Sequence, residues 1–206
     1  MNKEDLLRDI AETGYNVGFG SCKHFATFDI VSKTPGWIGF ISIAFGIYAL
    51  IFDSLTDKFY SATFVVIGVI GLYIAFYDEK KSNYESAGIE LRKLYNNLRQ
   101  LYFKVKSSNQ NNLDGFLQEL KDIESKYYST AITKQILFSD WYAHFKFFWQ
   151  LQIEWVHEQK KFKLLRDKIP LTAHLAIVLI IILIISHTIS KSELYINCIN
   201  MASSLP

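Results

Sequence analysis

Two uncharged apolar runs, separated by a short polar loop, constrain this chain more than any other feature. The first follows Thr34-Pro35-Gly36-Trp37 and ends at Phe52, and the second begins at Phe59 and ends at Tyr77. Each run is close to the roughly 20 residues that a helix needs to cross the hydrocarbon core of a bilayer. A helix also pairs its own backbone groups, which lipid cannot do. Since the loop 53–58 allows only an antiparallel return, we predict a transmembrane hairpin.

A third uncharged run covers residues 169–190 and is rich in Ile, Leu and Val. It contains no glycine, which favours a lipid-facing helix over a tightly packed one. The 206-residue chain is 50% hydrophobic and has a positive mean hydropathy, which together favour a membrane protein. The predicted fold class is therefore all-α: a helical integral membrane protein with an antiparallel transmembrane hairpin, a cytoplasmic helical region and a third C-terminal transmembrane helix.

The predicted organisation has five parts. They are an N-terminal amphipathic segment (1–33), the hairpin (34–77), a central helical region (78–168), the third span (169–190) and a tail (191–206).

The distribution of charge predicts how these parts are arranged across the membrane. The central region holds sixteen lysine and arginine residues against twelve acidic residues, whereas the loop 53–58 holds one lysine and two aspartates. The positive-inside rule then predicts a multi-pass membrane protein with the N-terminus and the central region in the cytoplasm and the tail outside. Cys22 and Cys198 would lie on opposite sides of the membrane, so we expect no disulfide between them.

The N-terminal segment is expected to begin as a helix capped by Asn2. Gly14, Gly18 and Gly20 follow closely, and three glycines argue against a regular helix interior. We therefore predict a packed elbow here, with the first membrane helix beginning at Pro35. The Gly18-x-Gly20 pair does not predict nucleotide binding, because the preceding strand and a third spaced glycine are missing.

Small residues recur along both helices of the hairpin at spacings of three and four. Lipid drives helix association only weakly, and small residues let two backbones approach closely. These positions are candidates for packing within the hairpin, or for contacts between copies of the chain and the lining of a pore. They are Gly39, Ser42, Gly46, Ala49, Gly68, Gly71 and Ala75.

A heptad-like pattern follows the hairpin. It predicts either a coiled coil that assembles subunits or a helix that packs within one subunit. The oligomerisation candidates are Tyr84, Leu91, Leu94, Leu98, Leu101 and Val105. Asn112 is expected to cap the next helix, whose apolar face would pack on the first.

Residues 136–168 are predicted to be one helix, unusually rich in aromatic residues and ending in clustered cations. Aromatic rings followed by cations just before a span are typical of the interface with an anionic leaflet. The predicted membrane-interface residues are Trp37, Trp149, Lys160, Lys161, Lys163, Arg166 and Lys168.

Catalytic and cofactor motifs do not emerge from the sequence. A P-loop, a zinc-protease motif and a nucleophile elbow are all missing. Glu154-x-x-His157 has the spacing of half a di-iron site, but no second copy exists. Asp140 and His144 are expected to form a hydrogen-bonded surface pair. We therefore expect no enzyme activity, no metal and no cofactor.

Several of these features together resemble the SLATT family, the two-transmembrane effectors associated with SMODS nucleotidyltransferases and SLOG sensors. The residues that carry the resemblance are Tyr15-Asn16-x-Gly18-Phe19-Gly20 and Lys23-His24-Phe25, followed by the glycine-bearing hairpin and the helix that continues from it. The resemblance extends from about Leu6 to about Leu165. The third span departs from the two-span pattern.

The resemblance implies a membrane effector that perforates or perturbs the inner membrane during phage attack. Its implied partners are the lipid bilayer, further copies of itself, and a neighbouring sensor, nucleotidyltransferase or reverse transcriptase, or its product. Direct binding of nucleic acid is not expected, since the net charge is only +2.

Two other functions stay open at this point. One is a non-toxic membrane anchor or scaffold, with residues 141–155 as the docking face for a soluble partner. The other is an accessory subunit of a transporter or channel, which the lack of charge in the middle of the spans disfavours.

Overall fold

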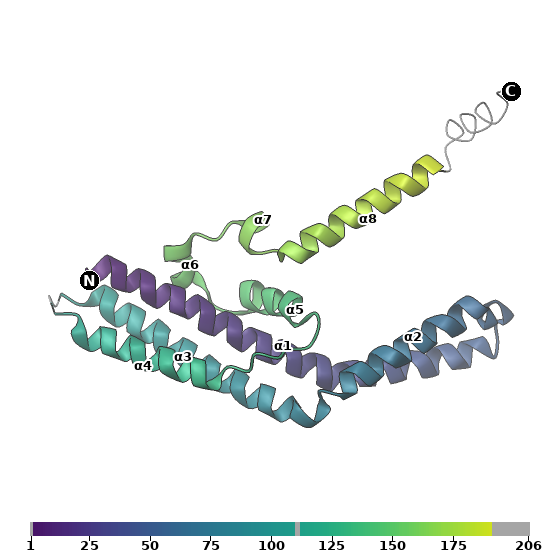
Figure 1. Ribbon diagram of the computed structural model, residues 1–206, viewed down its shortest axis with the longest axis horizontal. Helices are drawn as coiled ribbons and strands as arrows, with labels where there is room; N and C mark the ends of the chain where they lie inside the picture. Colours follow the sequence, from purple (N-terminus) through teal and green to yellow (C-terminus); the bar gives the residue numbers. More distant parts are fainter. Residues whose placement is uncertain (1, 110–111, 191–206) are drawn as a thin grey trace. The chain divides into compact units, whose positions relative to one another are not determined.

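The computed structural model describes residues 2–109 and 112–190, whose regular elements are all helical (Figure 1). The chain divides into two units, one ending at Phe162 and the other beginning at Lys163. Each unit is described by itself below. Within the described residues, three helices are long and apolar enough to cross a membrane, which confirms the predicted class of all-α membrane protein.

The first helix, α1 (Lys3–Ala49), is continuous over 47 residues. Its cap is the predicted one, since the Asn2 side chain accepts a hydrogen bond of 2.8 Å from the Asp5 N–H. The predicted elbow is wrong, and so is a helix start at Pro35, which lies inside α1. One rod therefore extends from the bundle of the first unit into the hairpin.

The glycines of α1 explain why the elbow does not form. A Cβ at Gly14 would lie 2.2 Å from Trp155 Cη2, and one at Gly18 would lie 2.7 Å from the Tyr95 ring. These glycines are places where large rings of other helices meet the α1 backbone. The packing that they permit outweighs the roughly 1 kcal/mol by which each glycine disfavours a helix relative to alanine.

The second helix, α2 (Lys58–Ala75), returns along the second half of α1 and forms the predicted hairpin (Figure 1). The turn contains the short 3-10 helix η1 (Asp53–Thr56). The Phe45 ring of α1 packs between rings of α2, with centroids 4.4 Å from Phe64 and 5.7 Å from Tyr60. A second 3-10 turn, η2 (Asp78–Lys80), then leads into the bundle.

The bundle core is formed by α3 (Lys81–Ser107), α4 (Asp114–Thr130) and the first half of α1. The Asn112 side chain caps the start of α4 by accepting from the Asp114 N–H at 2.9 Å. All six heptad residues are buried within this one chain: Tyr84, Leu91, Leu94, Leu98, Leu101 and Val105. This is packing within one subunit, the second of the two alternatives that the heptad pattern left open.

The predicted single helix over residues 136–168 is also wrong. It is divided into α5 (Ser139–Phe145), the π-helical turn η3 (Lys146–Gln150), α6 (Glu154–Lys160) and α7 (Leu164–Asp167). The break between η3 and α6 is held by the Tyr95 hydroxyl, which donates to the Gln152 carbonyl oxygen at 2.6 Å. This break lets the buried rings of Phe147 and Trp155 both reach α1, which a straight helix could not do.

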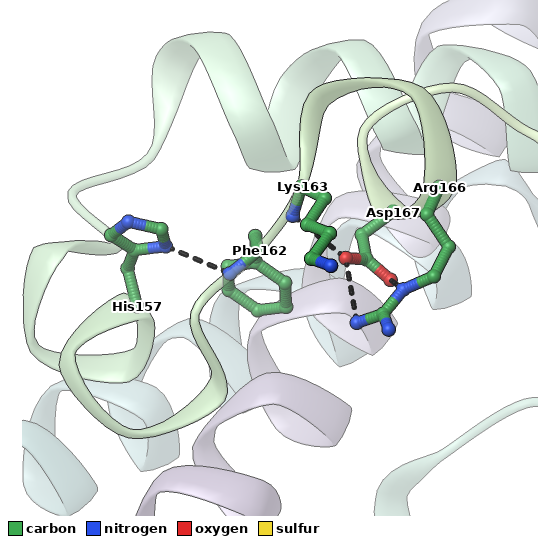
Figure 2. Close-up of polar contacts among 5 residues, drawn as sticks. All are labelled: His157, Phe162, Lys163, Arg166 and Asp167. Atoms are coloured by element: carbon green, nitrogen blue, oxygen red, sulfur yellow. Dashed lines mark hydrogen bonds and ion pairs between the residues drawn. The ribbon is translucent and has the colours of Figure 1, made fainter.

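The second unit contains α7 and α8 (Leu171–Ser190), the third apolar span. The Asp167 carboxylate caps α7 by accepting from the Lys163 N–H at 2.8 Å and pairs with Arg166 at 2.9 Å (Figure 2). The charge of Arg166 is thus matched locally. Cys198 and the predicted tail 191–206 lie outside the described residues.

Candidate functional site: the membrane hairpin and its junction with the bundle

The two helices of the hairpin face each other through only some of the predicted small residues. Ile38 and Phe45 of α1 contact α2, and helical spacing places the half-buried Ser42 and Ala49 on the same side. Gly71 of α2 meets this side, with Ile38 Cδ1 3.8 Å from where its Cβ would be.

The other small residues of the hairpin lie on its outer surface. Gly39, Gly46 and Gly68 have no atom within 4 Å of an added Cβ, and Ala75 is exposed. These three glycines therefore do not pack against the other helix of the same hairpin, so the prediction of packing within the hairpin is wrong for them. Contact with another copy of the chain stays a prediction. The other exposed residues of both helices are mostly large and apolar, which suits contact with lipid. The exposed glycines are shallow depressions in this apolar surface.

The junction between hairpin and bundle is covered by the segment 131–138, which connects α4 to α5 and is called the strap here. The Tyr84 hydroxyl donates to the Lys134 carbonyl oxygen at 2.7 Å. The Leu137 N–H donates to the Tyr73 hydroxyl at 3.3 Å. Ile136 is buried in the junction cluster. The strap thus joins the end of α2 to the beginning of α3.

The strap is also bonded to α1 through His24. The Ile132 N–H donates to His24 Nε2 at 2.9 Å, and His24 Nδ1 lies 2.7 Å from the Gly20 carbonyl oxygen. Since Nε2 accepts, the proton is on Nδ1 and the ring is neutral. Burial lowers the pKa of His24, which the Gly20 hydrogen bond opposes and the Lys23 charge reinforces. A neutral His24 is therefore part of the junction.

Acidification is expected to destabilise the first unit through this histidine. The pKa of His24 in the folded chain is below its ordinary value of 6.5, so its stabilisation is complete above pH 6.5 and is lost as the pH falls. One such proton gives a slope of at most about 1.4 kcal/mol per pH unit. Thermal unfolding in detergent between pH 7.5 and 5.5 measures this slope, and His24→Gln should reduce it.

Part of the pH dependence of stability should remain in His24→Gln, and we attribute it to His144. Burial lowers the pKa of His144 as well, although the charge of Asp140 opposes this shift. The double variant His24→Gln/His144→Gln serves as the control and should lose nearly all of the slope in this pH range. A wild-type slope in His24→Gln would show that the strap does not depend on the charge of His24.

The predicted Asp140–His144 surface pair is wrong. Asp140 pairs instead with Lys23 of α1 at 2.7 Å. The His144 Nδ1 atom is buried and has no hydrogen-bond partner, and its ring packs against Phe19 with centroids 4.9 Å apart. Aromatic packing, rather than a hydrogen bond, positions this histidine.

The remaining polar groups near α1 are structural. The Arg92 guanidinium lies 3.3 Å from Ser21 Oγ and 3.6 Å from Cys22 Sγ. Burial raises the pKa of the Cys22 thiol despite the nearby arginine, so this thiol is a poor nucleophile. Within the described residues, no three His, Cys, Asp or Glu side chains gather as metal ligands.

The predicted interface residues occupy different environments. Trp37 and Trp149 are both exposed. Lys160 lies over the Tyr15 ring at 5.1 Å, and Lys161 has a left-handed backbone conformation that ends α6. The His157 ring closes this turn by accepting from the Phe162 N–H at 3.0 Å (Figure 2). Several of these cations therefore have a local structural role. Lys163 and Lys168 belong to the second unit, at the two ends of α7.

Sequence reasoning did not identify the strap, His24, or the outward orientation of the hairpin glycines. The hydrogen bonds from Tyr84, Tyr73 and His24 to the strap go to its backbone atoms, which leave no residue signature. The orientation of Gly39 and Gly68 depends on how α1 and α2 are rotated against each other.

The family to which this architecture belongs can be identified by comparison. Residues 1–177 match the family described as SMODS and SLOG-associating 2TM effector domain 6. The match covers the bundle, the hairpin and the beginning of α8. Comparisons with curated proteins and with solved structures found no match. The chain belongs to the SMODS and SLOG-associating two-transmembrane effector family, in the group described as domain 6.

Proposed function

We propose that this protein is a membrane effector of an antiphage system, which oligomerises in the inner membrane and forms a pore or disrupts the bilayer when a sensing partner is activated. The observation that carries the proposal is the outward orientation of Gly39, Gly46 and Gly68. Glycines on a membrane helix let the backbone of a second helix approach closely, and contact with lipid chains does not require them. The proposed partner is the hairpin of a second copy, whose helices would pack against these three glycines.

The connection between bundle and hairpin supports a triggered action. α1 passes from the bundle core into the hairpin without a break, and only residues 76–80, which include η2, connect α2 to α3. The strap ties both helices together at this level through Tyr73, Tyr84 and His24. A partner that displaces the bundle would therefore also move the hairpin helices.

The proposed topology follows the positive-inside rule, with the N-terminus and the bundle on the cytoplasmic side and the hairpin loop outside. A neighbouring sensor or nucleotidyltransferase, or its product, would then act on the bundle from the cytoplasm. The proposed action uses no catalytic residue and no cofactor, because assembly of helices in lipid is sufficient for it.

Membrane potential in living cells tests the proposal. We expect potential to collapse within minutes when the chain is expressed, alone or together with the genes encoded beside it. A non-toxic anchor or scaffold would instead leave the potential intact under both conditions. Membrane fractionation must confirm in each case that the chain has been inserted. A potential that is maintained with inserted protein and active neighbours would contradict the effector function.

A further inference from the structure

The helix α5 has one side that faces the hairpin and one that faces away from it. On one side, Asp140 pairs with Lys23 and the His144 ring packs on Phe19. Both partners lie in the first half of α1, away from the hairpin (Figure 1).

On the other side, Tyr142 of α5 and Lys146 at the beginning of η3 lie near positions of α1 that are closer to the hairpin. The Lys146 ammonium pairs with Asp29, which also pairs with Lys33 at 2.6 Å. The same Lys146 Nζ lies 4.5 Å from the centre of the Tyr142 ring, so Tyr142 is on this side too. Since Lys33 directly precedes the first apolar run, this side of α5 is turned toward the hairpin.

The side turned toward the hairpin is aromatic. Tyr142 and Phe145 are three residues apart in α5 and share one face of it, with their rings stacked at 6.4 Å between centroids. Phe138 directly precedes α5 and Trp149 lies in η3, directly after it. Phe145 is 49% exposed and Trp149 is 67% exposed. Phe138 is exposed too, and it has a left-handed backbone conformation (φ 66°) that is uncommon for an aromatic residue.

This aromatic face adjoins the lipid-facing surface of the hairpin. The hydrogen bond from the Leu137 N–H to the Tyr73 hydroxyl places the beginning of α5 beside the last turn of α2. Leu72 in that turn and Phe76 directly after it are both highly exposed. On α1, Lys33 lines a shallow hollow together with Gly36, Trp37 and Phe40. The aromatic face is thus continuous with surface that lipid covers.

The charge at this level suits an anionic bilayer surface. Lys33 and Lys146 share the single carboxylate of Asp29, which leaves one net positive charge. Burial alone would raise the pKa of Asp29, but hydrogen bonds from the two lysines hold it below its usual range, so this carboxylate stays charged. Lysines beside exposed aromatic rings are typical of segments that lie in the headgroup layer.

We propose that α5 and η3 lie on the cytoplasmic surface of the bilayer, with Phe138, Phe145 and Trp149 in the headgroup layer and Lys33 at anionic headgroups. The occupant of this face is lipid, because the face continues the hairpin surface and carries net positive charge. In this position α5 limits how deep the hairpin lies. The inference rests on the proposed topology, in which the hairpin spans the bilayer and the bundle is cytoplasmic, and it does not depend on pore formation.

Spin labels measure the depth of this face in the full-length chain. Single cysteines replace Phe145, Trp149 or Phe103 in a Cys198→Ser background, which retains the buried Cys22. Phe103 is the matched control, because it is an aromatic residue of α3 that is 47% exposed. It lies close to the end of α3, which is bonded to Lys3 at the beginning of α1.

In nanodiscs of phosphatidylethanolamine and phosphatidylglycerol, the ratio of oxygen to nickel-chelate accessibility should be several-fold higher at positions 145 and 149 than at position 103. Replacing phosphatidylglycerol with phosphatidylcholine should lower the ratio at 145, and Lys33→Gln should weaken that dependence. A ratio at 145 equal to that at 103 would overturn the proposal. Shielding of 145 and 149 from both reagents would overturn it as well, since protein rather than lipid would then cover the face.

Discussion

Replacing Trp155 with alanine is expected to lower the free energy of unfolding by about 3–5 kcal/mol. The Trp155 side chain is only 3% exposed and lies between Tyr95 and Tyr102, with ring centroids 5.4 Å away in both cases. Its indole N–H donates to the Tyr95 hydroxyl at 3.0 Å. Alanine would leave a cavity at the crossing of α1, α3 and α6. Denaturant unfolding in detergent, followed by circular dichroism, measures the loss.

A double-mutant cycle tests whether the loss comes from the contact with α1. Gly14→Leu alone should also destabilise the first unit, because an added Cβ would lie 2.2 Å from Trp155 Cη2. Together with Trp155→Ala, the new leucine partly fills the cavity, so the two losses should not add, with a coupling of about 0.5–3 kcal/mol. The exposed Tyr128→Ala is the control and should stay within about 0.5 kcal/mol. Strict additivity would contradict the contact.

Replacing Gly68 with leucine is expected to abolish the toxicity of the chain. An added Cβ at Gly68 meets no atom within 4 Å, so one subunit accommodates leucine without strain. Leucine is also better than glycine in a helix by up to about 1 kcal/mol. The substitution should therefore leave folding and insertion intact while it fills the gap that a second hairpin would use. Colony counts after induction, with the membrane content of the chain, measure the effect.

Neighbouring positions provide matched controls for this result. Val65→Leu lies on the exposed surface of the same helix and changes no small residue, so toxicity should persist. Gly71→Leu is a less selective change, because Gly71 faces Ile38 within the hairpin and leucine there also disturbs the subunit itself. Gly46→Leu should act like Gly68→Leu. Full toxicity of Gly68→Leu at wild-type membrane content would contradict assembly through this surface.

Local patterns were sufficient to predict the hairpin and the buried face of α3. The apolar runs and the spacing of Leu91, Leu94 and Leu98 are properties of neighbouring residues, and both lead to helices wherever the chain lies. The same spacing did not reveal what covers that face. α3 packs against the glycine-bearing first half of α1 in the same chain.

Predictions from helix propensity failed where contacts with distant residues outweigh the local preference of the backbone. Gly14 and Gly18 disfavour a helix locally, but Trp155 and Tyr95 pack on their bare backbone, and α1 continues through both positions. The break at Gln152 within a helix-like sequence has the same origin, because the Tyr95 hydroxyl holds its carbonyl. In both cases the deciding partner comes from another part of the chain.

The sequence alone determined that this protein is an all-α membrane protein with a glycine-bearing hairpin, because hydrophobic length and period are local quantities. The tertiary structure alone decided which glycines are covered, where the strap attaches and which side of α5 is turned toward the hairpin. These depend on the rotation of each helix about its axis. That rotation is set by side-chain contacts between segments as much as 141 residues apart, as between Gly14 and Trp155.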